Sequence, residues 1–154
     1  MPYRPYAPTE TDRSYAYKYV WASAACSVTL LPLYLVGFDG IIYGWIMGGA
    51  AGGLLASTIT GRTDDYFRSL VAVGHRWAIF ALFAYMILGW FACVVDLAVP
   101  PGFGILAGEV REEHSGGATL LFDGHLAAIM LAIIYHAGYG YQWLRDRVGT
   151  EDEA

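Results

Sequence analysis

Four long stretches without a charged residue constrain the fold of this chain more than any other feature. They hold 20 residues after Lys18, 22 after Asp39, 19 after Arg76 and 19 after His125. About 20 apolar residues in a helix cross a bilayer core of about 30 Å. With 56% hydrophobic and only 15% charged residues, the chain has too little charge to cover a soluble domain. We therefore predict an all-α integral membrane protein with four transmembrane helices.

The uncharged stretches also divide the chain into a membrane domain and two tails. We expect a cytoplasmic tail over residues 1–18, a membrane domain over residues 19–143 and an acidic cytoplasmic tail over residues 144–154. Within the domain, the predicted spans cover about residues 19–36, 41–60, 77–99 and 119–143.

The basic residues predict the orientation of these spans. Eight of the nine fall on one side of the membrane in the four-span topology: Arg4, Arg13, Lys18, Arg62, Arg68, Arg76, Arg145 and Arg147. Only Arg111 falls in a loop on the other side. Since basic loops stay in the cytoplasm, both termini are expected inside, in what we take to be a bacterial inner (plasma) membrane. The chain has no basic face large enough to suggest a nucleic-acid partner.

The segment between the second and third spans predicts a short interfacial helix. Thr63 stands where a helix cap is needed, and Asp64 and Asp65 follow it, where carboxylates suit the positive end of the helix dipole. Phe67 and Leu70 fall on one face of this segment, as in an amphipathic helix.

Five glycines in the second span point to close helix packing. Gly44, Gly48 and Gly52 are four residues apart, and Gly49 and Gly53 stand beside them. Glycines at this spacing share one helix face and let a second backbone approach closely. That neighbour could be another helix of the chain, a second copy or a different membrane subunit. The bilayer and such subunits are therefore the expected partners.

The sequence Phe-Asp-Gly occurs twice, at Phe38–Gly40 and Phe122–Gly124, each time before an apolar span. The simplest interpretation is that Asp39 and Asp123 cap the helices that follow. The alternative is a cation or metal site on the outer side, because oxygen and imidazole ligands could converge there. Its candidate ligands would be Asp39, Asp96, Asp123 and His125.

His136 is the only ionisable residue deep inside a predicted span. Such a residue is a candidate functional site, because a charge or lone pair is costly to bury without a partner. His125 lies 11 residues earlier and therefore on nearly the same helix face. A neutral histidine bonded to a neighbouring helix is the plain interpretation. The alternative is haem b held by His136 and His75, although their predicted depths differ.

These observations favour a non-enzymatic role. The sequence has no nucleophile–histidine–carboxylate arrangement, no phosphate-binding loop and no pair of carboxylates within the spans, so we assign no catalytic residue. The leading hypothesis is an integral subunit or assembly factor that acts through helix packing. The alternatives are an oligomeric cation channel or transporter, with an acidic outer mouth and a His125–His136 stripe, and a b-type cytochrome subunit.

Overall fold

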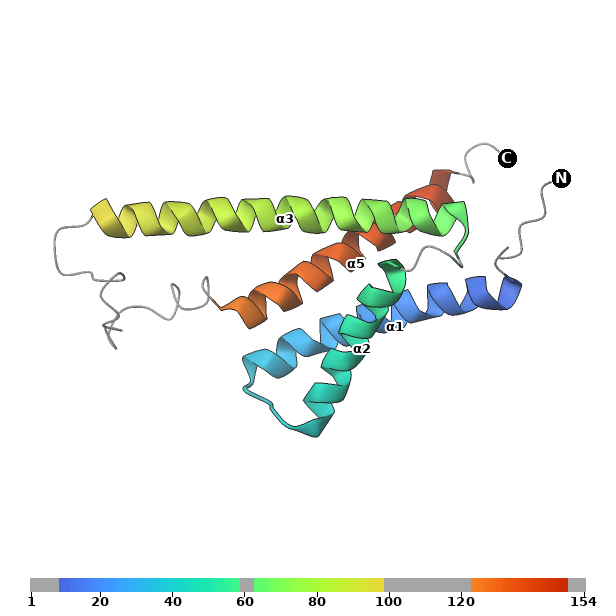
Figure 1. The fold of residues 1–154 in the computed structure, drawn as a ribbon, viewed down its shortest axis with the longest axis horizontal. Coiled ribbons are helices and arrows are strands. Elements are labelled where there is room, and N and C mark those ends of the chain that lie inside the picture. Colours follow the sequence, from blue (N-terminus) through green and yellow to red (C-terminus); the bar gives the residue numbers. More distant parts are fainter. Residues whose placement is uncertain (1–8, 59–62, 99–122, 150–154) are drawn as a thin grey trace.

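The computed structural model describes residues 9–58, 63–98 and 123–149, with only the backbone path for 92–98. These residues form four helices with a few non-helical residues beside them, and contain no strand (Figure 1). They are α1 (Glu10–Leu35), α2 (Ile41–Thr58), α3 (Asp65–Ala98) and α5 (Gly124–Gly149). The all-α prediction is confirmed for the described part of the chain.

Helix α1 begins at Glu10, well before the expected start of the first span. A capping box explains the early start: the Thr9 hydroxyl accepts from the Asp12 amide at 3.1 Å, and the Thr9 amide donates to the Asp12 carboxylate at 3.2 Å. Much of the segment expected as a tail is therefore helical. The helix ends at Leu35, and Gly37 turns the chain with a φ of 68°, which favours glycine.

Helix α3 is continuous, so the expectation of a separate interfacial helix before the third span is wrong. Its 34 residues run without a break from Asp65 to Ala98, about 51 Å at 1.5 Å per residue. Gly74 lies inside this helix, where the missing side chain makes room for the Tyr135 ring and backbone of α5. The cap is Asp64, one residue beyond the predicted Thr63, and its carboxylate accepts from the Phe67 amide at 2.8 Å.

The helices pack in a chain of pairs, with α2 on α1, α1 on α5 and α5 on α3. Figure 1 shows α2 crossing α1 obliquely, while α1, α3 and α5 run more nearly along the long axis of the molecule. One core cluster comprises Val20, Phe67, Leu70, Val71 and Tyr139. A second comprises Leu30, Ala50 and Ile129.

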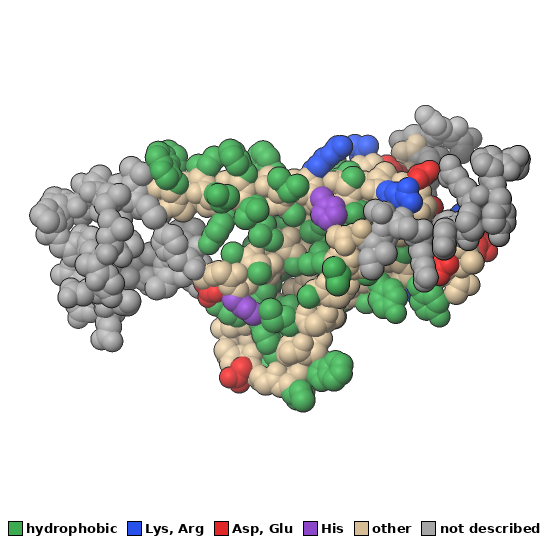
Figure 2. Space-filling model, in the orientation of Figure 1, with side chains coloured by type: hydrophobic (Ala, Val, Ile, Leu, Met, Phe, Trp, Pro, Cys, Tyr) green, Lys and Arg blue, Asp and Glu red, His purple; other side chains and the backbone are tan. Residues whose placement is uncertain are grey.

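Two helices, α2 and the Asp65–Phe91 part of α3, are long and apolar enough to cross a membrane. Their mean hydropathies are 1.3 and 1.6. In each helix, only 17% of the 18-residue apolar stretch is buried inside the protein. Large apolar side chains are exposed instead, including Ile41 at 80%, Trp45 at 76% and Phe80 at 74%. Figure 2 shows hydrophobic side chains spread along the surface of α3 and at the far tip of α2.

Candidate functional site

Four polar side chains meet where α1 ends and α2 and α5 begin, which we call the far end of the bundle. The Tyr34 hydroxyl donates to the Asp123 carboxylate, and the Tyr43 hydroxyl is hydrogen-bonded to Nε2 of His125. The His125 ring also stacks on both tyrosines, with centroid distances of 5.3 Å to Tyr34 and 5.8 Å to Tyr43. This far-end cluster therefore ties α5 to both helices of the α1–α2 hairpin.

The helix that follows each Phe-Asp-Gly turn begins at a different point. Helix α5 begins at the glycine of its turn, Gly124, whereas α2 begins one residue after the glycine, at Ile41. Asp123 caps α5 as predicted: its Oδ1 accepts from the amides of His125 at 2.9 Å and Leu126 at 3.1 Å. In the first copy the capping position is Gly40, whose carbonyl accepts from the Gly44 amide at 3.1 Å. Asp39 precedes that position, and its exposed carboxylate makes no hydrogen bond within the described residues. Capping is thus confirmed at Asp123 and not found at Asp39.

The predicted metal ligands are only partly brought together. Asp123 and His125 share the far-end cluster, whereas Asp39 is exposed in the α1–α2 turn. The side chain of Asp96 lies outside the described residues. Where side chains are described, no three of His, Cys, Asp and Glu gather closely enough to hold a metal. The four-ligand site stays a prediction.

His136 is buried at 7% exposure and presents one free ring nitrogen. Its Nδ1 lies 2.7 Å from the carbonyl oxygen of Ala132. Since a carbonyl can only accept, Nδ1 carries the proton and Nε2 carries the lone pair. Nε2 and the hydroxyl of Tyr139, three residues further along α5, are both buried without a hydrogen bond among the described residues. The predicted hydrogen bond to a neighbouring helix is therefore not found among the described residues, because the bond that His136 makes is to a carbonyl of its own helix, α5.

His75 and His136 both contact the buried ring of Tyr135. The centroid distances to Tyr135 are 5.1 Å for His75 and 5.0 Å for His136. A haem coordinated by both imidazoles would have to displace this tyrosine from at least one of these contacts. The free Nε2 of His136 suits an axial ligand, but the position of Tyr135 does not suit a bis-histidine site. The haem hypothesis stays a prediction.

The His125–His136 stripe is interrupted midway. Ile129 occupies the stripe between the two histidines and packs with Leu30 and Ala50 in the second core cluster. This apolar contact separates the far-end cluster from the buried polar groups around His136. A cation following this face of α5 would have to pass it.

The five glycines of α2 divide into two faces. A Cβ at Gly49 would lie 2.9 Å from the Cys26 sulfur, and one at Gly53 would lie 2.1 Å from the Ser23 Cβ. These two glycines therefore make the close contact with α1. No other helix among the described residues comes within 4 Å of a Cβ built at the remaining three, which form the open glycine face: Gly44, Gly48 and Gly52.

A second polar contact, which the sequence did not suggest, joins α1 to the start of α3. The Tyr17 hydroxyl donates to Asp64 Oδ1 at 3.2 Å, and the same carboxylate caps α3. Burial, together with the Asp64 carboxylate, raises the pKa of the Tyr17 phenol, so it stays protonated as a donor. The pair lies at the opposite end from the far-end cluster, in what we call the basic end, where α1 and α3 begin and α5 ends.

Comparisons with protein-family models, curated proteins and solved structures find no match to this chain. Its function therefore has to be argued from its own residues.

Proposed function

We propose that this chain is a small polytopic membrane protein that acts, without catalysis of its own, as a subunit or accessory factor of a membrane complex. The exposed apolar surface supports membrane insertion. A core helix of a soluble protein would be mostly buried, whereas α2 and α3 expose most of their 18-residue apolar stretches. Such a large apolar surface is unfavourable in water and is accommodated by lipid or by partner helices.

The charge distribution supports a topology with both ends in the cytoplasm of a bacterial inner membrane. The described cations lie towards the basic end, on α1, the first part of α3 and the last part of α5: Arg13, Lys18, Arg68, Arg76, Arg145 and Arg147. On the face shown in Figure 2, the blue side chains lie over the right half of the view. In this proposal all four described helices span the membrane, and the basic end faces the cytoplasm.

The open glycine face of α2 is the observation that carries the packing role. Helices associate in lipid through van der Waals contact and therefore need small residues where their backbones meet. Gly49 and Gly53 already serve the α1 contact, whereas a Cβ at Gly44, Gly48 or Gly52 would meet no other described helix within 4 Å. A shallow groove lined by Ile41, Gly44, Trp45, Gly48 and Gly49 runs along this face. We infer that a helix from another subunit or another copy packs there.

Leucine at Gly48 tests this role. A side chain on the open face should leave the isolated chain folded but prevent a second backbone from approaching. We expect Gly48→Leu to reduce the mass of the complex isolated in mild detergent to that of the free chain. Gly89→Leu is the matched control, because Gly89 on α3 is also open but lies on a different helix. An assembly of unchanged mass in the Gly48 variant, or equal loss in both, would refute the proposal.

The orientation is tested by labelling introduced cysteines in intact cells. In a background with Cys26→Ser and Cys93→Ser, a membrane-impermeant maleimide should label Ser115→Cys from outside. It should label Ser14→Cys and Thr150→Cys only after the cells are opened. Labelling of either terminal position in intact cells would reverse the proposed topology.

Haem binding remains an alternative with a direct spectroscopic test. Protein purified from haem-replete cells would show a Soret band, and alanine at His75 or His136 would remove it. A colourless wild-type protein would end this alternative without affecting the packing proposal.

A further inference from the structure

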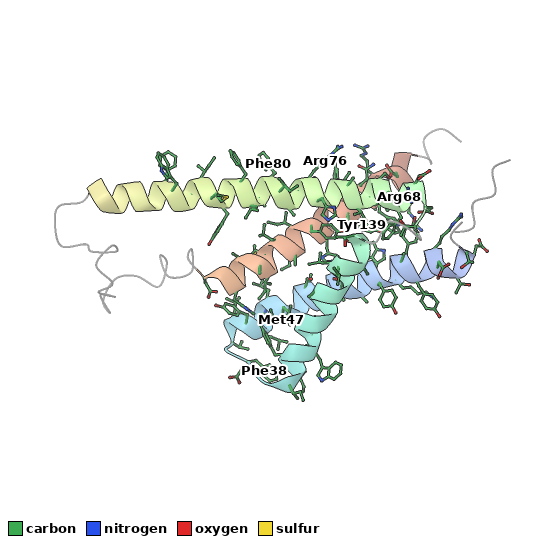
Figure 3. All side chains as sticks on the ribbon, viewed as in Figure 1. Phe38, Met47, Arg68, Arg76, Phe80 and Tyr139 are labelled. Atoms are coloured by element: carbon green, nitrogen blue, oxygen red, sulfur yellow. The ribbon has the colours of Figure 1, made fainter. Side chains whose placement is uncertain are left out.

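A shallow groove of about 500 Å³ runs between α3 and α5 beside the basic end. Among the described lining residues, all are apolar except Arg76 at one end. These residues are Arg76, Trp77, Phe80, Ala81 and Ile134. Figure 3 shows Arg76 and Phe80 on the side of α3 that points away from α1 and α2. The groove is therefore open to whatever surrounds the protein rather than to its interior.

Helical spacing and one glycine build this groove. Arg76 and Phe80 are four residues apart and share a face of α3, as do Trp77 and Ala81. Ala81 also lines the groove, and its small side chain leaves space there. Gly138 of α5 lets Trp77 come close, since a Cβ there would lie 2.7 Å from the Trp77 ring. The Trp77 ring also contacts Tyr141 at a centroid distance of 5.7 Å, so the wall of the groove is held in place.

Arg76 is an exposed cation at one end of this groove. It forms no ion pair with any described residue, whereas Arg68 on the same helix pairs with Asp65 at 3.3 Å. A guanidinium can bind a phosphate through two parallel hydrogen bonds. At the edge of the apolar part of α3, the group that meets both an arginine and an apolar groove is a lipid with an anionic head.

We propose that this groove binds one anionic phospholipid, with its phosphate on Arg76 and an acyl chain along Phe80, Ala81 and Ile134. The inference rests on the proposed membrane location, because an acyl chain reaches this groove only from a bilayer. Charge complementarity favours an anionic over a zwitterionic lipid, since the described residues that line the groove include one cation and no carboxylate.

Native mass spectrometry of the detergent-purified chain tests the headgroup contact. The protein would be titrated with phosphatidylglycerol and, separately, with phosphatidylcholine. Arg76→Gln should lower the affinity for phosphatidylglycerol about fivefold, the effect of one basic residue near an anionic lipid. Arg68→Gln is the matched control: it removes the same charge from the same helix about 12 Å away and outside the groove. It should retain the wild-type affinity.

A second pair of variants tests the acyl chain. Ala81→Leu should fill the groove and weaken phosphatidylglycerol binding, whereas Ala72→Leu, at an exposed position on the same helix, should not. Glycerol phosphate, which carries the headgroup charge without a chain, should not compete with the lipid. Competition by glycerol phosphate would mean that free phosphate compounds, rather than lipids, occupy the site.

Three results would overturn the inference: equal losses in the Arg76 and Arg68 variants, no loss in the Ala81 variant, or equal affinity for the two lipids in the wild type. Each can occur in a chain that is fully inserted in the membrane. Failure of the proposed location would appear earlier, as a chain recovered from the soluble fraction of cells without detergent.

Discussion

Two adjacent glycines of α2 should respond in opposite ways to alanine. Gly53 faces α1, and a Cβ there would lie 2.1 Å from the Ser23 Cβ, 2.6 Å from its Oγ and 2.9 Å from the Tyr19 carbonyl oxygen. That carbonyl belongs to the backbone of α1, so rotation of the serine cannot relieve the whole clash. A Cβ at Gly52 meets nothing within 4 Å.

The magnitudes follow from three terms. Replacing glycine by alanine in a helix gains about 1 kcal/mol at either position. At Gly53, overpacking costs about 1–3 kcal/mol. Displacing Ser23 also disturbs its 2.7 Å hydrogen bond to the Ala50 carbonyl, which costs about 1 kcal/mol. We therefore expect Gly53→Ala to destabilise the chain by about 1–3 kcal/mol and Gly52→Ala to stabilise it by up to about 1 kcal/mol.

Unfolding of the monomer in mild detergent, followed by far-ultraviolet circular dichroism during titration with a denaturing detergent, measures this difference. Conditions are chosen so that the chain is monomeric, because Gly52 lies on the face proposed for association. Equal changes in the two variants, or stabilisation by Gly53→Ala, would show that α2 does not pack on α1 through Gly53.

Two further predictions concern the hydrogen bonds at the two ends of the bundle. Asp123→Ala should lower the free energy of unfolding by about 2–3 kcal/mol, because it removes the cap, worth about 1 kcal/mol, and the hydrogen bond from Tyr34 to the carboxylate, worth about 1.5 kcal/mol. Asp39→Ala should change it by less than about 0.5 kcal/mol, and equal effects in a denaturant titration would contradict the assignment of the two turns. Tyr17→Phe should cost about 1.5 kcal/mol at neutral pH, because it removes a hydrogen bond to a carboxylate. The raised pKa of Tyr17 means that this contribution is complete below about pH 10 and is lost as the pH rises through the folded-state pKa. The difference between wild type and Tyr17→Phe should therefore narrow only above about pH 10, and a difference that narrows between neutral pH and that point would count against the Tyr17–Asp64 bond.

The sequence predicted correctly that the described segments are helices, because the uncharged stretches are long. Helix α2 was expected over residues 41–60 and is observed as Ile41–Thr58. Helix boundaries outside those stretches were predicted less well, because they depend on local hydrogen bonds. The early start of α1 follows from the Thr9–Asp12 capping box, a pattern that is present in the sequence but stands among polar residues expected as a tail.

The continuity of α3 could not be predicted from local preference. Glycine inside a helix costs about 1 kcal/mol relative to alanine, so Gly74 reads as a weak point. In the structure Gly74 accepts the Tyr135 ring of α5, and this tertiary contact offsets the local cost. The far-end cluster was missed for a related reason. Tyr34 and Tyr43 are close to His125 only because α1, α2 and α5 converge, and sequence spacing carries no sign of that convergence.

The hydrogen bonds of the far-end side chains favour a packing subunit over a cation channel or transporter. The Asp123 carboxylate is engaged by two backbone amides and by Tyr34, and His125 is held by Tyr43. These groups fasten helices together, whereas a cation mouth would need them facing water.

The apolar contact between His125 and His136 also favours a packing subunit over a channel. His125 and His136 are about 16 Å apart along α5, and the contact of Ile129 with Leu30 stands between them. A conducting path would have to open that contact and break the hydrogen bonds of the far-end cluster. A packing subunit needs both to stay closed, and it leaves the open glycine face of α2 as the surface through which the chain would act.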